Sequence, residues 1–160
     1  SRSILIKLGN ADISRLQMNQ LTLIECVYFL PSRSSGNWGN IYLDDDAFYQ
    51  FLKDADILCM TRVGSDFANA GFPFKLGEYL ATGNPVIASR VGDVDRYLNN
   101  SEDALLIEPD DVSAIAEAME YSIQNQDTVL EMGRRGREKC RQYFDPVANS
   151  KALCAFFQEI

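Results

Sequence analysis

The sequence predicts an α/β domain with a Rossmann-like, doubly wound parallel sheet. Short apolar runs alternate with helical patterns along most of the 160 residues. These runs are continuously apolar, which is typical of strands that helices cover on both faces of a parallel sheet. Apolar residues make up 46% of the chain, so the composition supports a packed core. No internal repeat, low-complexity tract or linker interrupts the pattern, which indicates one domain or one part of a larger protein.

The first part of the chain predicts three strands and a helix. Strands are expected at 3–9 (SILIKLG), 26–31 (CVYFLP) and 57–60 (ILCM). A loosely helical stretch separates the first two, and a polar, glycine-rich loop follows at 32–40. The segment 44–56 predicts a helix, because its opening aspartates favour the positive end of a helix dipole. Its apolar face, at helical spacing, consists of Phe48, Phe51, Leu52 and Ala55.

The segment 71–89 (GFPFKLGEYLATGNPVIAS) predicts a loop, a helix and a fourth strand. Pro73 suits the first turn of the helix, because its missing N–H needs no partner there. Gly83 is expected to end the helix, with Pro85 just beyond it. The fourth strand then covers 85–89.

One more strand follows. A short helix at 93–98 precedes the fifth strand at 104–109. Asp110 and Asp111 are cap candidates for the next helix. The apolar stripe of that helix consists of Val112, Ile115, Met119 and Ile123.

Two helical segments complete the chain. The segment 128–143 is helical in pattern, although Gly133 and Gly136 weaken it. A last helix begins at 145–146, with an apolar side formed by Leu153, Phe156, Phe157 and Ile160. We expect the Phe156–Phe157 pair to pack in the core or against another part of the protein.

Charge and composition exclude several classes of function. The formal net charge of −8 repels phosphate backbones, so no nucleic-acid partner is expected. The chain contains no histidine, which excludes Ser-His-Asp, Cys-His and H-E-x-x-H chemistry within it. Its four cysteines form no C-x-x-C pair and match no zinc pattern, so no metal site is predicted. They favour a reducing compartment, with Cys59 as a buried free thiol.

The loop after the strand at 57–60 is the main candidate site, because open α/β sheets bind ligands beyond the carboxyl ends of their strands. Gly71 precedes a helix, where exposed N–H groups and the helix dipole together suit a diphosphate. Lys75 adds a point charge, and Glu78, one turn deeper, suits the hydroxyls of a ribose. The alternative is a surface Lys–Glu pair worth about 0.2–0.5 kcal/mol.

Three other segments are weaker candidates. One segment resembles an anion nest, and it consists of Arg33, Ser34, Ser35 and Gly36. In this interpretation Trp38 would stack on a base. The alternative is a plain surface loop. The acidic run 44–46 is interpreted as a helix cap rather than a metal site. The basic segment 133–141 (GRRGREKCR) is interpreted as a solvated helix face, with contact to an anionic membrane surface as the alternative.

Ordered motifs between 44 and 145 resemble the retaining GT-B glycosyltransferases of family 4, the glycosyltransferases group 1. The segment 71–98 is similar to the family's donor-binding signature, in which a glycine-rich loop and a helix with a glutamate precede A-x-G-x-P-V-I-A-S. FYQFLKDADILCM resembles the family's preceding unit, and NNSEDALLIEPDDVSAIAEAM resembles its next strand–helix unit. The resemblance implies the C-terminal, donor-binding half of a GT-B enzyme.

The resemblance also implies a set of donor-binding residues, with no catalytic side chain and no metal. Gly71 and Phe72 would present backbone N–H groups to the phosphates, and the backbone of 74–76 would lie beside the sugar and diphosphate. Glu78 matches the second glutamate of the family's E-x7-E motif, which holds the ribose, and Lys75 would lie near the diphosphate. The complete set is Gly71, Phe72, Pro73, Phe74, Lys75, Leu76 and Glu78.

The chain departs from the family pattern at two places. The first glutamate of E-x7-E falls where this chain has Ala70, which leaves the sugar and the level of activity open. The run 3–9 resembles the family's second strand, so the opening strand–helix unit and the N-terminal acceptor domain are expected to be missing. The chain 1–160 would then supply only the donor-binding wall of a two-domain cleft and be inactive alone.

The implied reaction moves a hexose from a nucleoside diphosphate sugar to an acceptor hydroxyl without a cofactor. The acceptor would be a glycan or lipid-linked glycan in polysaccharide biosynthesis, reached through the missing domain. The protein is expected in the cytoplasm, with the inner face of the membrane as a possible peripheral contact. The rival from another class is a non-catalytic GT-B-like binding domain, which Ala70 supports. A sugar-nucleotide epimerase is a weaker rival, because its histidine-dependent chemistry has no residue here.

Overall fold

A computed structural model describes residues 5–8, 26–29 and 45–158 of the chain. The described strands form a five-stranded, all-parallel sheet in the order β2-β1-β3-β4-β5. Each lies within a run that predicted it, and the strands are β1 (Leu5–Leu8), β2 (Cys26–Phe29), β3 (Ile57–Met60), β4 (Val86–Ser89) and β5 (Leu105–Ile107). The expected helical stretch before β2 and the candidate loop containing Arg33, Ser34, Ser35, Gly36 and Trp38 lie outside the described residues.

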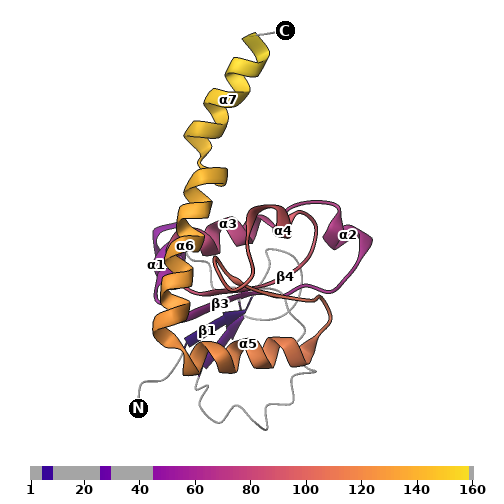
Figure 1. Ribbon diagram of the computed structural model, residues 1–160. Helices are drawn as coiled ribbons and strands as arrows, with labels where there is room; N and C mark the ends of the chain where they lie inside the picture. The colour runs from indigo at the N-terminus through magenta and orange to yellow at the C-terminus, as the bar shows by residue number, and fades with distance from the viewer. Residues whose placement is uncertain (1–4, 9–25, 30–44, 159–160) are drawn as a thin grey trace.

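The central strands are buried on both faces, because consecutive side chains point to opposite sides of the sheet. In β3, Leu58 and Met60 join one core cluster, and Ile57 and Cys59 join the other. Helix α3 (Phe74–Thr82) lies over the first cluster and helix α5 (Val112–Gln124) over the second, on opposite sides of the sheet (Figure 1). The predicted doubly wound class is therefore confirmed. Cys59 is a buried free thiol as predicted, and burial raises its pKa.

Among the residues that the structure describes, four short or moderate helices connect strands on the α3 side of the sheet. They are α1 (Asp45–Lys53), α2 (Asp66–Asn69), α3 and α4 (Val94–Tyr97). The sequence predicted only a loop before α3, but Ser65 caps α2 there by accepting a hydrogen bond from the N–H of Ala68 at 3.1 Å. Pro73 occupies the N-cap position, one residue before the predicted first turn. Gly83 ends α3 as predicted, with a left-handed φ of 80°.

Helix α6 (Gln126–Phe144) connects the two layers. Its first half packs into one cluster through Met132, and its second half reaches the other through Phe144. The two glycines that weakened its prediction are contact points. A Cβ on Gly133 would lie 2.5 Å from the carbonyl oxygen of Gly83, and one on Gly136 would lie 2.6 Å from that of Asp103. Glycine is therefore required where α6 meets the loops after α3 and α4.

Helix α7 (Pro146–Gln158) extends away from the rest of the molecule (Figure 1). None of its described residues is buried, and Phe156 and Phe157 are 58% and 67% exposed. The prediction that this pair packs in the core is wrong. The extended backbone of Asp145 ends α6, and the new helix leaves the body of the domain instead of folding back. The alternative, packing against another part of the protein, stays a prediction.

Candidate functional site

Hydrogen bonds join the loops at the carboxyl ends of β3, β4 and β5. The Ser89 hydroxyl accepts a hydrogen bond from the N–H of Arg62 at 2.9 Å. The Asp110 carboxylate, after β5, accepts one from the N–H of Gly64 at 2.7 Å. The segment leading to α3 is thus held at the edge of the sheet where open α/β folds bind ligands.

The amino end of α3 presents backbone donors. Pro73 at the N-cap has no N–H, and it makes no side-chain cap. Within the part of the chain that the structure describes, no acceptor bonds the N–H groups of Gly71, Phe72 or Phe74. A Cβ added to Gly71 would meet nothing within 4 Å, so the space beside it is open. Unpaired N–H groups at the positive end of a nine-residue helix suit an anionic ligand.

Lys75 and Glu78 lie one turn apart on α3, and both are half-buried. Burial lowers the pKa of Lys75, the Glu78 carboxylate raises it, and the Arg62 guanidinium lowers it. Two cationic groups and one carboxylate therefore share this neighbourhood. The Glu78 carboxylate accepts no hydrogen bond from a described residue, and it lines an open hollow of about 420 Å³ between α1, α3 and α6. Its oxygens are accessible to the hydroxyl groups of a ligand.

The other predicted site residues contribute backbone rather than side-chain groups. Pro73 and Leu76 are buried and anchor the start of α3. The Phe72 ring packs in an aromatic cluster, 5.4 Å from the Tyr97 ring and 4.8 Å from the Phe144 ring between centroids. Phe74 is 91% exposed, so its side chain borders open space. The structure thus brings all seven predicted residues to one helix end, where only Lys75 and Glu78 offer polar side chains.

Position 70 has no polar side chain. Ala70 is the C-cap of α2 and is exposed, with its N–H 3.4 Å from the carbonyl oxygen of Phe67. The methyl group of Ala70 can accept no hydrogen bond from a sugar hydroxyl. Any sugar contact at this position has to come from the backbone or from another residue.

The sequence analysis missed Arg62 as a member of the site. The guanidinium of Arg62 acts electrostatically on Lys75, and its backbone is fixed by Ser89. A basic residue two positions after a buried strand, at its carboxyl end, is the signal that was available. Only the packing of α3 against β3 brings Arg62 close enough to act electrostatically on Lys75.

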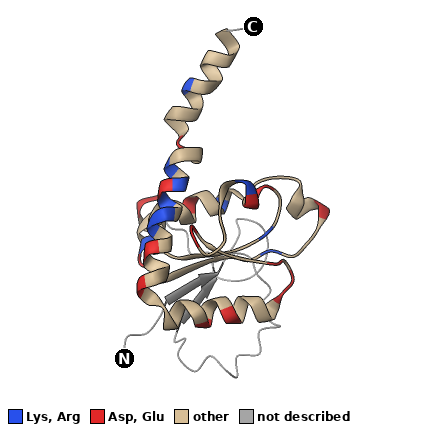
Figure 2. Cartoon of the chain, viewed as in Figure 1, with Lys and Arg blue, Asp and Glu red and all other residues tan. Residues whose placement is uncertain are grey.

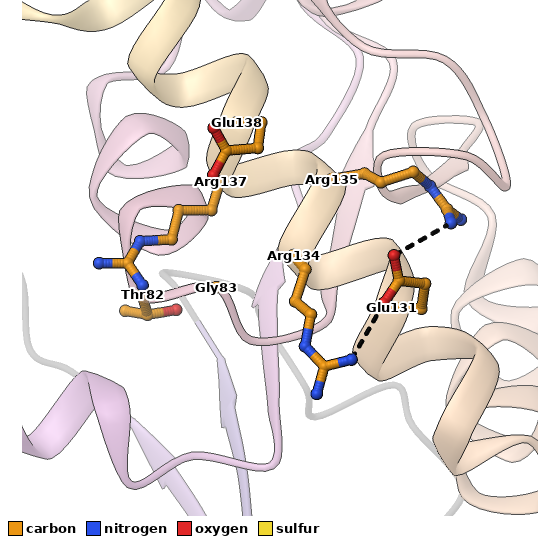
Figure 3. Close-up of a pocket in the computed structure, with 7 residues that line it drawn as sticks. All are labelled: Thr82, Gly83, Glu131, Arg134, Arg135, Arg137 and Glu138. Atoms are coloured by element: carbon orange, nitrogen blue, oxygen red, sulfur yellow. Dashed lines mark hydrogen bonds and ion pairs between the residues drawn. The ribbon is translucent and has the colours of Figure 1, made fainter.

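A second hollow, of about 450 Å³, lies at the opposite end of α3 (Figure 3). Arg134 and Arg135 line it and both pair with Glu131, at 3.0 Å and 3.8 Å. In Figure 2 the ribbon of α6 alternates between positions of basic and of acidic residues, and most of these charged residues are exposed, which agrees with the predicted solvated helix face. This hollow adjoins Gly83 and the negative end of the α3 dipole, so it is separate from the candidate anion site.

Two further findings concern residues 5–8, 26–29 and 45–158, the part of the chain that the structure describes. In these segments no group of three or more His, Cys, Asp or Glu side chains could hold a metal ion. No helix within the same residues combines the length and the apolar character needed to cross a membrane. Asp45 and Asp46 lie in the first turn of α1, as expected from the interpretation of the acidic run as the start of a helix.

Comparisons with known proteins point to one family. The family model described as "Glycosyl transferases group 1" matches residues 19–125, more than half of the chain. A phosphatidyl-myo-inositol mannosyltransferase from Mycobacterium leprae is 26% identical over 149 residues, covering 93% of this chain and 36% of the relative. WcaL from Salmonella typhimurium, which carries a provisional assignment as a colanic acid biosynthesis glycosyltransferase, is 29% identical over 68% of this chain and 27% of its own length.

Solved structures show the same fold. Anabaena HepE in complex with UDP matches 98% of this chain and 41% of its own, with a TM-score of 0.71 and 17% identity. A glycosyltransferase from Rickettsia africae matches 99% of this chain and 48% of its own, with a TM-score of 0.68 and 15% identity. The chain spans about a quarter to a third of the length of the curated relatives it matches. On the match to the family model, the chain belongs to the glycosyl transferases group 1.

Proposed function

We propose that this chain forms the donor-binding domain of a retaining, family-4-like hexosyltransferase that takes a hexose from a nucleoside diphosphate sugar. The main support is the amino end of α3, where unpaired N–H groups lie next to Lys75 and Glu78, and Arg62 acts electrostatically on Lys75. HepE, which shares the fold, has been solved in complex with UDP and with UDP-glucose. The membership in a glycosyltransferase family supports transfer chemistry over simple binding.

Each group at the helix end has a role in this proposal. The N–H groups of Gly71 and Phe72 and the dipole of α3 bind the diphosphate, with Lys75 as a nearby positive charge. When the glycosidic bond breaks, negative charge grows on the departing diphosphate, and these fixed donors stabilise it. The Glu78 carboxylate accepts hydrogen bonds from the ribose hydroxyls.

No side chain of this chain is assigned as a general base. A phosphate oxygen of the donor can accept the proton of the acceptor hydroxyl while the sugar keeps its anomeric configuration. This assistance by the donor fits a site whose described polar groups would bind a diphosphate. No cofactor and no bound metal enter the proposal.

In this proposal the acceptor binds to a part of the protein outside residues 1–160. We propose that an N-terminal domain binds a glycan or lipid-linked glycan and closes the cleft, so that residues 1–160 alone are inactive. The opening strand–helix unit of the donor domain would belong to that additional sequence. The whole enzyme would act in polysaccharide biosynthesis in the cytoplasm, at the inner face of the membrane.

A non-catalytic binding domain is the rival proposal. Its support is Ala70, because the family places a sugar-contacting glutamate at this position. The open amino end of α3 and the accessible Glu78 carboxylate support a working donor site instead. A domain that had lost donor chemistry would have no need to keep these groups together.

Nucleotide binding tests the proposal directly. UDP, GDP and their glucose and mannose conjugates are titrated into the full-length protein, and the amide resonances of residues 71–78 are followed. At least one nucleotide should shift them, and Glu78→Ala should abolish that binding. Glu117→Ala, at an exposed acidic position of α5, is the matched control and should bind normally. Unchanged spectra with every nucleotide would favour the rival.

A further inference from the structure

The turn after β4 lies against the backbone of the site at the carbonyl group of Gly71. A Cβ added to Gly92 would lie 2.3 Å from the carbonyl oxygen of Gly71 and 3.1 Å from its carbonyl carbon. Contacts below 3.0 Å are not sustained by real Cβ atoms, so the Gly71 carbonyl occupies the place where any other residue would have a side chain. The approach is possible only because residue 92 is glycine.

The backbone conformation at position 92 does not by itself explain why this residue is a glycine. Its φ of 56° lies in the left-handed region, but Ser101 and Asp110 have φ values of 63° and 64° with side chains present. The chain therefore accepts a Cβ at such φ values elsewhere. The requirement at Gly92 comes from the carbonyl of Gly71.

That contact sets the direction of one N–H group. The Gly71 carbonyl and the Phe72 N–H belong to the same peptide unit, and no cis peptide bond occurs among the described residues. In a planar trans peptide the C=O and N–H point in opposite directions. Because the carbonyl faces Gly92, the Phe72 N–H faces away from the turn after β4.

Two further contacts hold this peptide in place. The Asn69 side chain accepts a hydrogen bond from the N–H of Gly92 at 3.1 Å, which fixes the turn against α2. The Phe72 ring packs on Tyr97, in the helix that follows the turn. The segment from Gly92 to Tyr97 thus contacts both residues, Gly71 through Gly92 and Phe72 through Tyr97.

We propose that Gly92, held by Asn69, is a positioning residue that orients the Phe72 N–H toward the diphosphate of the donor. This inference rests on the proposed function, because Gly92 would orient an N–H group that binds the ligand at the same site. Gly92 itself does not contact the ligand. Its role is to leave room for the Gly71 carbonyl. With a side chain at position 92, this peptide unit would rotate, and the Phe72 N–H would no longer point toward the diphosphate.

Asparagine substitutions separate this role from a general loss of structure. Gly92→Asn keeps a residue type that tolerates left-handed φ but adds a Cβ. Gly83→Asn is the matched control, because Gly83 also has a positive φ, of 80°, and its nearest side-chain neighbour is the flexible Arg137 at 3.3 Å. Asparagine is accepted at helix C-termini such as this one. Both variants are made in the full-length protein and titrated with UDP and with UMP.

The expected result is selective for the diphosphate. Gly92→Asn should weaken UDP binding about 10- to 100-fold, the effect of one hydrogen bond to a charged group. The UMP affinity should fall less, so the UDP-to-UMP affinity ratio should drop, and UDP should no longer shift the Phe72 amide resonance. Gly83→Asn should bind both nucleotides like the unmodified protein.

A second variant covers the case in which Gly92→Asn does not fold. Asn69 is exposed, so Asn69→Ala removes only the hydrogen bond to the turn and should weaken UDP binding about 3- to 10-fold. If the unmodified protein binds no nucleotide, the proposed function and this inference both fail. If it binds UDP and the Gly92 and Asn69 variants bind it equally well, only the positioning role is overturned.

Discussion

The Ser89 hydroxyl bridges both backbone groups of Arg62, accepting from its N–H at 2.9 Å and donating to its carbonyl oxygen at 3.3 Å. Ser89 is 1% exposed and ends β4, whereas Arg62 is the second residue of the loop after β3. One buried hydroxyl therefore fixes the loop that carries a charged neighbour of Lys75. The backbone pairing of β3 with β4 extends only to Met60 and Ala88. Beyond that point, the Ser89 side chain joins the two segments in place of backbone hydrogen bonds.

Replacing Ser89 with alanine tests this bridge. Ser89→Ala should lower the free energy of unfolding by about 1–3 kcal/mol, because it leaves two partly buried backbone groups without a partner. Urea unfolding followed by circular dichroism measures the change. Ser150→Ala, on the exposed face of α7, should change stability by less than about 0.5 kcal/mol. Equal stabilities for the two variants would contradict the bridge.

Two helix glycines should respond to alanine in opposite directions. Gly133→Ala adds a Cβ 2.5 Å from a backbone oxygen, and we expect a loss of about 1–3 kcal/mol despite the better helix propensity of alanine. Gly77→Ala meets nothing within 4 Å and should stabilise α3 by about 0.5–1 kcal/mol. Thermal and urea unfolding of both variants measure these changes. A stabilising Gly133→Ala would show that α6 does not pack this closely.

Nucleotide binding should weaken at alkaline pH through Lys75. Burial lowers the pKa of Lys75 from its ordinary value of 10.5, while Glu78 raises it and Arg62 lowers it. As the pH rises through this lowered pKa, Lys75 loses its charge and the diphosphate loses a partner. Lys75→Arg keeps its charge in this range and should flatten the pH dependence of the UDP dissociation constant. Parallel pH profiles for the two proteins on the alkaline side of neutrality would exclude Lys75 as the cause.

The same shift has a consequence for stability without ligand. The folded-state pKa of Lys75 lies below its unfolded value, so the unfolded chain binds more protons between the two. Stability contributed by this group therefore rises with pH across that window. Lys75→Arg removes this rise, which urea unfolding at a series of pH values can detect.

The buried hydroxyl of Tyr79 is predicted to be dispensable. It has no hydrogen-bond partner among the described residues, and burial is the main cause that raises the pKa of Tyr79 to about 12. Tyr79→Phe should leave stability unchanged or raise it by up to about 1 kcal/mol, because it removes a desolvated polar group. Tyr79→Ala should cost about 3–5 kcal/mol through the cavity it leaves in the core. A large loss for Tyr79→Phe in urea unfolding would reveal a hydrogen bond at this hydroxyl.

Because the pKa of Tyr79 is raised, the unmodified protein and Tyr79→Phe should also differ in how their stability depends on pH. The folded-state value lies above the ordinary value of 10.0, so its contribution to stability is complete below pH 10 and is lost as the pH approaches 12. Tyr79→Phe lacks a titrating group and should lose less stability over that interval. Equal losses would assign the alkaline unfolding to other residues.

The sequence alone determined the chain order of the described strands and of the described helices other than α2, and it determined where helix α3 ends. Continuous apolar runs can only be satisfied by burial on two faces, and Gly83 before Pro85 stops a helix through local backbone geometry. The candidate set from Gly71 to Glu78 was also predicted from sequence, because one short segment supplies it. Such features depend on neighbours within a few residues, which the sequence displays directly.

Tertiary structure decided what depends on contacts between distant segments. Arg62 beside Lys75, Gly92 against the carbonyl of Gly71, and the glycine contacts of α6 each join residues from different elements. Helix α7 shows the converse, since its apolar pattern predicted burial that no described residue provides. A local pattern states which surface a segment can bury, but the three-dimensional path of the chain determines whether another surface comes within van der Waals distance of it.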